Sequence, residues 1–218
     1  MWRNGSVYAA IACINGLYPI HASAVAVGGQ VFAFTGPSGA GKSTLVAELS
    51  RRGLPLFCDD TLVLDLSQPD RIVCLPGHKR LKLWPDALAM TGAKAQDQVM
   101  ASLPKFYAEP VGEVVTNALP LAELCFLEHG SPPRIEPLSG GEKLVRLQDD
   151  HYTTEMYLAA SRPDRLDRFR QLAQLARTLR LIRFVRPRDR ERFSTDAALV
   201  AQHILMQAGG SSQPDSDR

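Results

Sequence analysis

The sequence predicts an α/β protein with a mixed sheet, an antiparallel hairpin that leads into a phosphate-binding loop, and flanking helices. The main observation is the run GPSGAGKS at residues 36–43. It follows an apolar stretch and precedes a stretch with helical periodicity, which is the strand–loop–helix context that this pattern requires. The second observation is Gly28-Gly29, which joins two strand-forming runs directly ahead of the loop.

The remaining elements follow from apolar periodicity and from turn residues. Residues 7–14 form a short apolar run that predicts either a strand or a short buried helix. Further strands are expected at residues 20–27, 30–35, 54–58, 61–66, 71–75, 119–127 and 181–185. Helices are expected at residues 43–53, from Pro85 onward, and at residues 139–147, 165–180 and 195–206.

Two segments carry weaker patterns. Residues 91–117 contain two glycines and two prolines without a sustained period, which is typical of a functional loop or lid. Residues 209–218 are polar and rich in Gly and Ser, so we expect a disordered C-terminal tail. We therefore expect one catalytic domain at residues 1–208 and a tail at residues 209–218.

Composition sets limits on the class of protein. The chain has 218 residues, of which 45% are hydrophobic and 22% charged, and its net charge is +2. These values are those of a soluble globular protein and favour neither nucleic-acid nor membrane binding. The four cysteines are far apart, which predicts reduced thiols and a cytoplasmic location.

The loop predicts binding of ATP with Mg²⁺. Its glycines allow successive N–H groups to point at a phosphate, and the following helix adds the positive end of its dipole. Lys42 is expected to reach the β- and γ-phosphates, and the Ser43 hydroxyl to bind Mg²⁺. The predicted nucleotide-binding residues are Gly36, Pro37, Ser38, Gly39, Ala40, Gly41, Lys42, Ser43 and Thr44.

A kinase also needs a carboxylate that faces the acceptor hydroxyl. Asp59-Asp60 is the best candidate, since it ends an apolar strand where an acid would hold Mg²⁺. Adjacent side chains on an extended chain point to opposite sides, so one carboxylate is expected at the metal and the other at the substrate. His21, at the start of the hairpin, is a candidate to bond a phosphate oxygen or to orient the aspartate. For both sites the alternative is a structural role.

Several cations are candidates for contacts to phosphate or substrate. Arg186 follows the last predicted strand and is a candidate for the transferred phosphate. Lys79, Arg80 and Lys82 are candidates to line the acceptor groove. The alternative is that these cations are solvated surface residues.

Together, His21 with the following Ala-Ser-Ala, the hairpin, the loop and Asp59-Asp60 resemble HPr kinase/phosphorylase and its stand-alone relatives. The separations agree with that family: 21 residues from His21 to Lys42, and 18 from Lys42 to Asp60. The resemblance covers residues 21–65. It implies a fold like the catalytic core of phosphoenolpyruvate carboxykinase.

The resemblance also implies an activity: ATP-dependent phosphorylation of a serine hydroxyl on a protein. It implies that Asp60 is the general base, that His21 is an active-site histidine, and that Asp59 assists Mg²⁺. Thr44 stands where the family has Glu, and residues 82–86 (KLWPD) resemble a shortened branch that includes kinases of lasso-type peptides.

The expected partner is therefore a ribosomally made, lasso-type peptide or a small protein such as HPr. Assembly into a homo-oligomer is left open. Two other classes also stay open: a small-molecule kinase or carboxykinase-like phosphotransferase, and an ATP-sensing module without catalysis.

Overall fold

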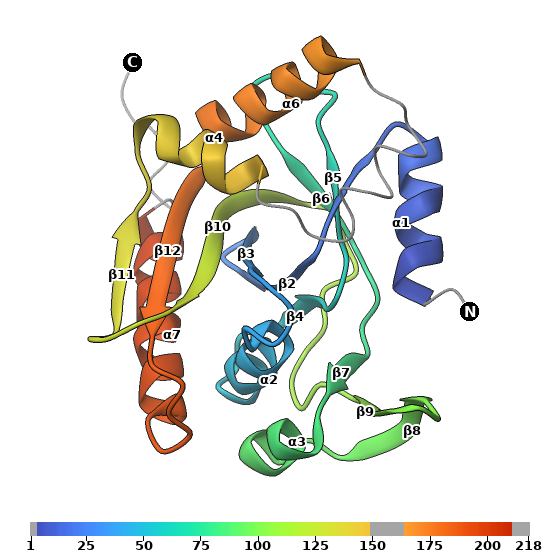
Figure 1. Ribbon diagram of the computed structural model, residues 1–218, viewed down its shortest axis with the longest axis vertical. Coiled ribbons are helices and arrows are strands. Elements are labelled where there is room, and N and C mark those ends of the chain that lie inside the picture. Colours follow the sequence, from blue (N-terminus) through green and yellow to red (C-terminus); the bar gives the residue numbers. More distant parts are fainter. Residues whose placement is uncertain (1–3, 149–163, 211–218) are drawn as a thin grey trace.

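A computed structural model describes residues 4–148 and 164–210, and for residues 4–6 it describes the backbone alone. In these ranges nine strands form a large sheet (Figure 1). Its strands are β1 (Tyr18–Ile20), β2 (Ala22–Val27), β3 (Gln30–Thr35), β4 (Leu56–Cys58), β5 (Leu62–Asp65), β6 (Val73–Leu75), β10 (Leu119–His129), β11 (Arg134–Pro137) and β12 (Arg180–Arg186). Strand β10 is parallel to β3 and β12 and antiparallel to β6, so the predicted mixed sheet is confirmed.

The hairpin that enters the loop is formed by β2 and β3. The two strands pair antiparallel, from Val27 opposite Gln30 to Ala22 opposite Thr35. Gly28 and Gly29 both have positive φ, 58° and 72°, which a two-residue hairpin turn of this hand requires. The loop therefore follows an antiparallel strand, as the sequence predicts.

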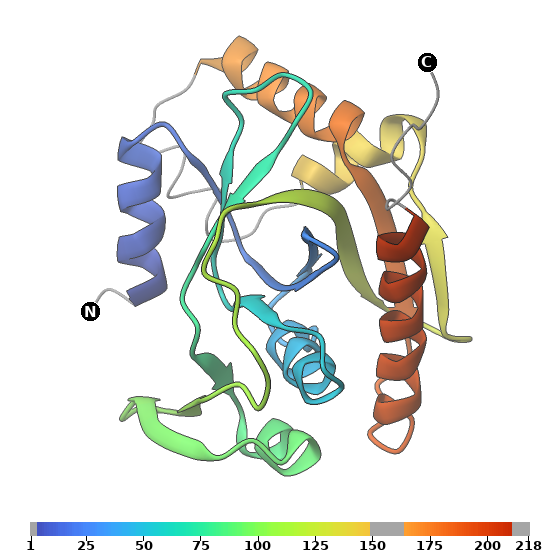
Figure 2. The same ribbon diagram turned by 180° about the vertical axis from the view of Figure 1, so that it is seen from behind.

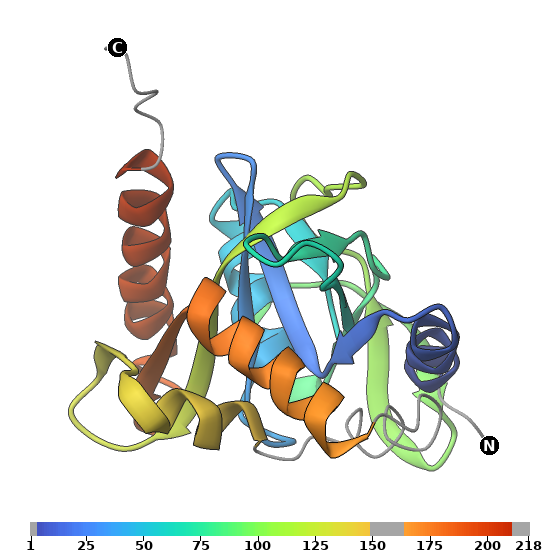
Figure 3. The same cartoon turned by 90° about the horizontal axis from the view of Figure 1, so that it is seen from above.

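Helices cover both faces of the sheet, and alternate side chains of β3 show why. Phe32 and Phe34 pack into a core shared with α2 (Lys42–Arg51) and α7 (Phe193–Gly210). Val31 and Ala33 face a second core, shared with α1 (Asn4–Ile14) and α6 (Arg165–Thr178). Helix α4 (Gly140–Gln148) packs beside α6, and α1 and α7 lie at opposite ends of the molecule (Figure 3). Because both faces are buried, the central strands lack an apolar–polar alternation.

Residues 91–117 are more ordered than the sequence predicts. Strands β8 (Ala95–Met100) and β9 (Leu103–Ala108) pair antiparallel, and β9 also pairs with β7 (Leu81–Leu83). This small sheet lies beside α3 (Pro85–Thr91), at the bottom of Figure 2. The strand signal was hidden because β8 is exposed and polar along most of its length, and because β9 contains a proline, at a position that takes no part in the pairing.

The two ends of the described chain differ from expectation. Residues 7–14 lie in helix α1, of which only one face is buried: Ala9, Ala12 and Cys13 are buried, whereas Val7, Ile11 and Ile14 are each about half exposed or more. At the other end, α7 continues through Gly210, two residues into the expected tail. Residues 211–218 lie outside the described residues. No helix in the described ranges is both long and apolar enough to span a membrane.

The other predicted helices are present with shifted ends. The loop helix α2 ends with Arg52 as its cap, and Gly53, with φ 90°, lies one residue beyond the cap rather than on it. Helix α3 begins at Pro85, as predicted. Helix α6 ends at Thr178, because Arg180 already belongs to β12. Its Leu172 and Leu175 are buried, whereas Leu166 and Phe169 are exposed.

Candidate functional site

The loop between β3 and α2 has the backbone of an anion cradle. Gly39 and Gly41 have φ of 82° and 88°, and Gly41 is the N-cap of α2. The φ of Gly41 favours glycine, and a Cβ atom there would lie 2.5 Å from the Arg186 guanidinium, which would have to shift. The unpaired N–H groups of the first helical turn follow directly, and such groups bind phosphate.

A cavity of about 560 Å³ lies over the loop. Segments that are far apart in the sequence meet around it. Its lining includes residues 38–44, His21, Asp60, Lys82, Lys105, His129 and residues 186–190. Of the predicted nucleotide-binding residues, Gly36 and Pro37 lie outside the lining and contribute carbonyl groups to the loop instead.

Lys42 is the loop cation at this cavity. Its Nζ atom donates to the carbonyl oxygens of Gly36, at 2.7 Å, and Pro37, at 3.1 Å. Burial lowers the pKa of Lys42 to about 8, and nearby Asp59 and Asp60 oppose this effect. A bound phosphate would favour the charged ammonium for the same electrostatic reason.

Asp60 occupies an unusual backbone position. Its φ is +74°, the only positive value at a non-glycine residue in the described chain. This conformation costs roughly 1–2 kcal/mol for a residue with a Cβ, although Asp tolerates it better than most. The ring Nδ1 of His21 lies 2.8 Å from the Asp60 carbonyl oxygen and holds this turn in place.

The Asp60 carboxylate faces the cavity between two basic groups. Its Oδ2 lies 2.5 Å from Lys82 Nζ, and its Oδ1 lies 3.8 Å from His21 Nδ1. Burial alone would raise the pKa of Asp60, but Lys82, and after it His21 and Lys105, outweigh burial and hold the pKa below the usual range. Asp60 is therefore an ionised carboxylate, and the structure brings it together with His21 and Lys42 at one cavity.

Asp59 does not occupy the position predicted for a metal ligand. Its side chain is buried, and both oxygens are used inside the protein. Oδ1 accepts from Ser23 Oγ at 2.6 Å, and Oδ2 accepts from the backbone N–H of Lys82 at 2.8 Å. Asp59 is absent from the cavity lining, because the turn at Asp60 sends the two carboxylates in different directions. In this structure the Asp59 carboxylate ties β2 to β7, and its role as a metal ligand stays a prediction.

Ser43 remains the candidate metal ligand, since it lines the cavity at the start of α2. In residues 4–148 and 164–210, no three His, Cys, Asp or Glu side chains gather as a metal-binding cluster. Mg²⁺ does not need such a cluster, because it takes one or two protein ligands together with phosphates and water. The residues present therefore fit a Mg²⁺ ion that is bound together with a nucleotide.

Arg186, a predicted phosphate contact, lies beside the loop. It is the last residue of β12, and its guanidinium donates to the Ala40 carbonyl oxygen at 3.1 Å. The guanidinium also lies 5.5 Å from the centre of the Phe193 ring. Burial lowers the pKa of Arg186, but arginine remains charged at any physiological pH.

The small sheet supplies cations that face the loop. Lys82 on β7 is directly opposite Tyr107 on β9, so Lys105, two residues from Tyr107, points to the same face. Lys82 and Lys105 both line the cavity, whereas Lys79 and Arg80 do not. Lys79 donates to the Phe57 carbonyl oxygen, and Arg80 lies over the Tyr107 ring at 4.2 Å. Of the three predicted groove residues, only Lys82 is placed at the cavity.

Sequence reasoning missed Lys105 and His129. Lys105 lies on strand β9, in a stretch whose sequence pattern predicts a loop. His129 ends β10, directly opposite Arg186 in the parallel pairing, and its Nε2 accepts from Arg188 Nε at 2.9 Å. Strands β10 and β12 both end in polar residues, and their parallel pairing places His129 beside Arg186. This placement can be predicted only if residues 119–129 and 180–186 are known to be neighbours in the sheet.

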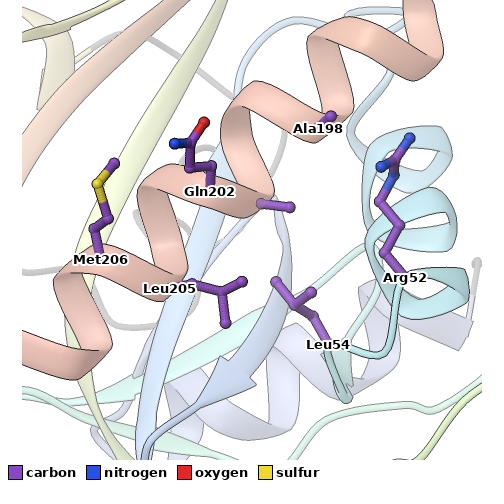
Figure 4. Close-up of a pocket in the computed structure, with 7 residues that line it drawn as sticks. Arg52, Leu54, Ala198, Gln202, Leu205 and Met206 are labelled. Carbon is purple, nitrogen blue, oxygen red and sulfur yellow. The ribbon is translucent and has the colours of Figure 1, made fainter.

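A second hollow, of about 550 Å³, lies between α7 and the end of α2 (Figure 4). Its lining is mainly apolar and includes Leu54, Leu205 and Met206. Arg52 is the ionisable residue in its described lining, and it is bonded to Glu48 and Ser194. This hollow contains no candidate acid or base, so the candidate site is the cavity at the loop.

No protein-family model and no curated protein sequence matches this chain. Among solved structures, the chain is similar to the HPr(Ser) kinase/phosphatase from Coxiella burnetii. The match covers 89% of this chain and 94% of that chain, at 14% sequence identity and a TM-score of 0.44.

Proposed function

We propose that this protein is an ATP-dependent kinase that transfers the γ-phosphate of ATP to a serine hydroxyl on a peptide or small protein. The observation that carries the proposal is the position of Asp60. An ionised carboxylate shares one cavity with the phosphate loop, Lys42 and Arg186. An ATP-sensing module would need the loop but not this carboxylate.

The residues divide the work of transfer between them. The loop N–H groups, Lys42 and Arg186 bind the phosphates and neutralise charge that develops on them. Ser43 holds Mg²⁺, which supplies further charge neutralisation when bound. Asp60 accepts the proton of the serine hydroxyl while the serine oxygen bonds to the γ-phosphorus. The bond from that phosphorus to the β–γ bridging oxygen breaks, leaving ADP and phosphoserine.

His21 positions the carboxylate in this scheme. It holds the Asp60 carbonyl oxygen and lies near Oδ1, so it maintains the turn that aims the carboxylate at the cavity. The positive φ of Asp60 supports this reading, because strained backbone is commonly retained at functional sites. We assign the reaction to the cytoplasm, where ATP and reduced thiols occur. All four cysteines are buried, and none of them is in a disulfide.

The acceptor class is a proposal that follows from the resemblance in residues 21–65 and 82–86. We favour a ribosomally made, lasso-type peptide, with a small HPr-like protein as the second candidate. The test is incubation with γ-labelled ATP, Mg²⁺ and two acceptor sets, serine-containing peptides and small proteins. Each acceptor is paired with a version in which serine is replaced by alanine.

Label on the serine acceptor, and none on its alanine partner, supports the proposal. Nucleotide binding with no transfer to any acceptor would leave an ATP-sensing module. Transfer to a small molecule instead would indicate the phosphotransferase alternative.

A further inference from the structure

Lys82 is held as the partner of Asp60 by its surroundings. Its ammonium lies 2.5 Å from Asp60 Oδ2, and the two side chains are only 9% and 12% exposed. Its backbone N–H is bonded to Asp59 Oδ2, and its neighbours Leu81 and Leu83 are buried in the core. The Cα position of Lys82 is therefore fixed, while the unbranched side chain keeps several rotatable bonds.

This ion pair occupies an oxygen of the proposed base. While the ammonium bonds Oδ2, a hydroxyl approaching that oxygen must compete with a full positive charge. A carboxylate so paired also has less tendency to take up a proton. The reaction therefore needs a way to move Lys82 away from Asp60.

A triphosphate in the cavity offers that way. Lys82 lines the same cavity as residues 38–44, so its ammonium and a terminal phosphate bound at the loop would share one cavity. The terminal phosphate carries more negative charge than one carboxylate and presents three acceptor oxygens. In a site of low exposure, this excess charge acts with little solvent screening.

We propose that Lys82 changes partner during the reaction, leaving Asp60 for the terminal phosphate when a nucleoside triphosphate binds. The exchange frees Asp60 to accept the proton of the acceptor hydroxyl, and it makes the site selective for triphosphate over diphosphate. It rests on the proposed function in one respect, that Asp60 is the base. Nucleotide then has to bind before the acceptor hydroxyl can be deprotonated.

The exchange predicts which nucleotides lose affinity when Lys82 is changed. Lys82→Met should weaken binding of a non-hydrolysable ATP analogue roughly ten- to a hundredfold, the range expected for one charge-assisted hydrogen bond. Binding of ADP should change by less than about threefold, since ADP lacks the terminal phosphate that Lys82 contacts. Isothermal titration calorimetry measures both affinities.

Arg80→Met is the matched control. Arg80 directly precedes β7 and carries the same charge, but its guanidinium lies over Tyr107 and bonds Gln96, and it is not part of the cavity lining. It should leave the ratio of the two affinities unchanged. Equal losses for analogue and ADP in Lys82→Met, or no loss for either, would overturn the exchange.

Asp60→Asn gives a prediction of opposite sign. Removing the carboxylate charge releases Lys82, so the analogue should bind several-fold more tightly than to the native protein, with ADP little changed. In the double variant Asp60→Asn/Lys82→Met this gain should disappear. If Asp60→Asn gives no gain, or if the double variant keeps it, Lys82 does not move between the two partners.

Two features keep the test decisive. Lys82→Met leaves a buried carboxylate without its cation, and if it fails to fold, Asp60→Asn compared with the double variant still measures the Lys82 contact. The affinities also need no acceptor. If Lys82→Met selectively loses analogue binding but the native protein phosphorylates no acceptor, the Lys82 contact stands and the kinase is refuted. If the native protein phosphorylates an acceptor but Lys82→Met leaves the ratio of analogue to ADP affinity unchanged, the kinase stands and the exchange is refuted.

Discussion

The two walls of the cavity are built differently. One wall, residues 38–44 with Asp60, is positioned by backbone conformation: glycines with positive φ, the hairpin register, and the turn held by His21. The other wall presents side chains from distant strands, namely Lys82, Lys105 and Arg186. In the structure, Lys82 and Arg186 are paired with groups of the first wall.

This difference shows how the site divides its tasks. A wall made of backbone can bind phosphate only in one place, because its N–H groups cannot move without breaking the sheet and helix. A wall made of long cations can exchange partners at little cost in backbone energy. Substitution of Asp60 should therefore abolish a step, whereas substitution of the cations at the cavity should alter affinity or selectivity.

The largest effect is expected from Asp60→Asn in the first wall. Loss of the proposed general base should lower the rate of phosphate transfer by about 10²- to 10⁴-fold. Asn tolerates positive φ, so the turn should survive, and nucleotide binding should be retained. Single-turnover transfer of labelled phosphate to a serine acceptor measures the rate. Transfer at the native rate would remove Asp60 from the chemistry.

Asp59→Ala tests the neighbouring carboxylate, which the structure assigns to stability. It would leave the buried Ser23 hydroxyl and the Lys82 N–H without their acceptor. We expect a loss of about 2–4 kcal/mol in the free energy of unfolding, from one or two unsatisfied buried groups. Urea denaturation provides the measurement, with Asp65→Ala, at a half-buried strand end, as a control. An unchanged stability together with lost Mg²⁺ dependence would restore the metal role.

Lys42→Ala should weaken nucleotide binding roughly ten- to a hundredfold, by removing a charge-assisted contact to phosphate. Unlike Lys82→Met, it should affect ATP and ADP alike, since Lys42 is expected to contact the β-phosphate as well. Calorimetric titration with both nucleotides distinguishes the two lysines. Unchanged affinity for ATP would contradict the assignment of this loop as a phosphate site.

The smallest effect concerns the helix that supports the loop. The Glu48 carboxylate is buried and bonds Arg51 and Arg52, and Arg52 reaches Ser194 on α7. Burial raises the pKa of Glu48, but the two arginines outweigh it, so the pKa falls below the ordinary value of 4.5. Glu48→Gln should lower the unfolding free energy by about 1–2 kcal/mol at pH 7.

The difference in unfolding free energy between the native protein and Glu48→Gln should depend on pH. A depressed pKa means that the charged form stabilises the folded state above the unfolded pKa. The gap between native protein and variant should therefore be full above about pH 5 and shrink in acid as Glu48 is protonated. Thermal unfolding from pH 3 to 8 tests this. A gap that is independent of pH would show that the charge of Glu48 contributes nothing.

The sequence alone determined most of the first wall. The loop, the hairpin and the strand that ends at Asp59-Asp60 are local features, since glycine positions, turn pairs and apolar runs within 40 residues specify them. The α/β class and the mixed sheet followed from the same signals. The small sheet was missed, because strand β8 is polar and its pairing with β9 is visible only once the chain folds.

The tertiary structure decided which side chains line the cavity. The sequence does not distinguish Asp59 from Asp60. In the structure, where Asp60 has a positive φ, its carboxylate faces the cavity, whereas the Asp59 carboxylate bonds Ser23 and Lys82. Lys105 and Arg186 reach the cavity through strand pairings that join segments tens of residues or more from the loop. Local sequence specifies backbone conformation. Which charged side chains come together at the cavity depends on how distant strands pair, and that pairing is determined only when the whole core packs.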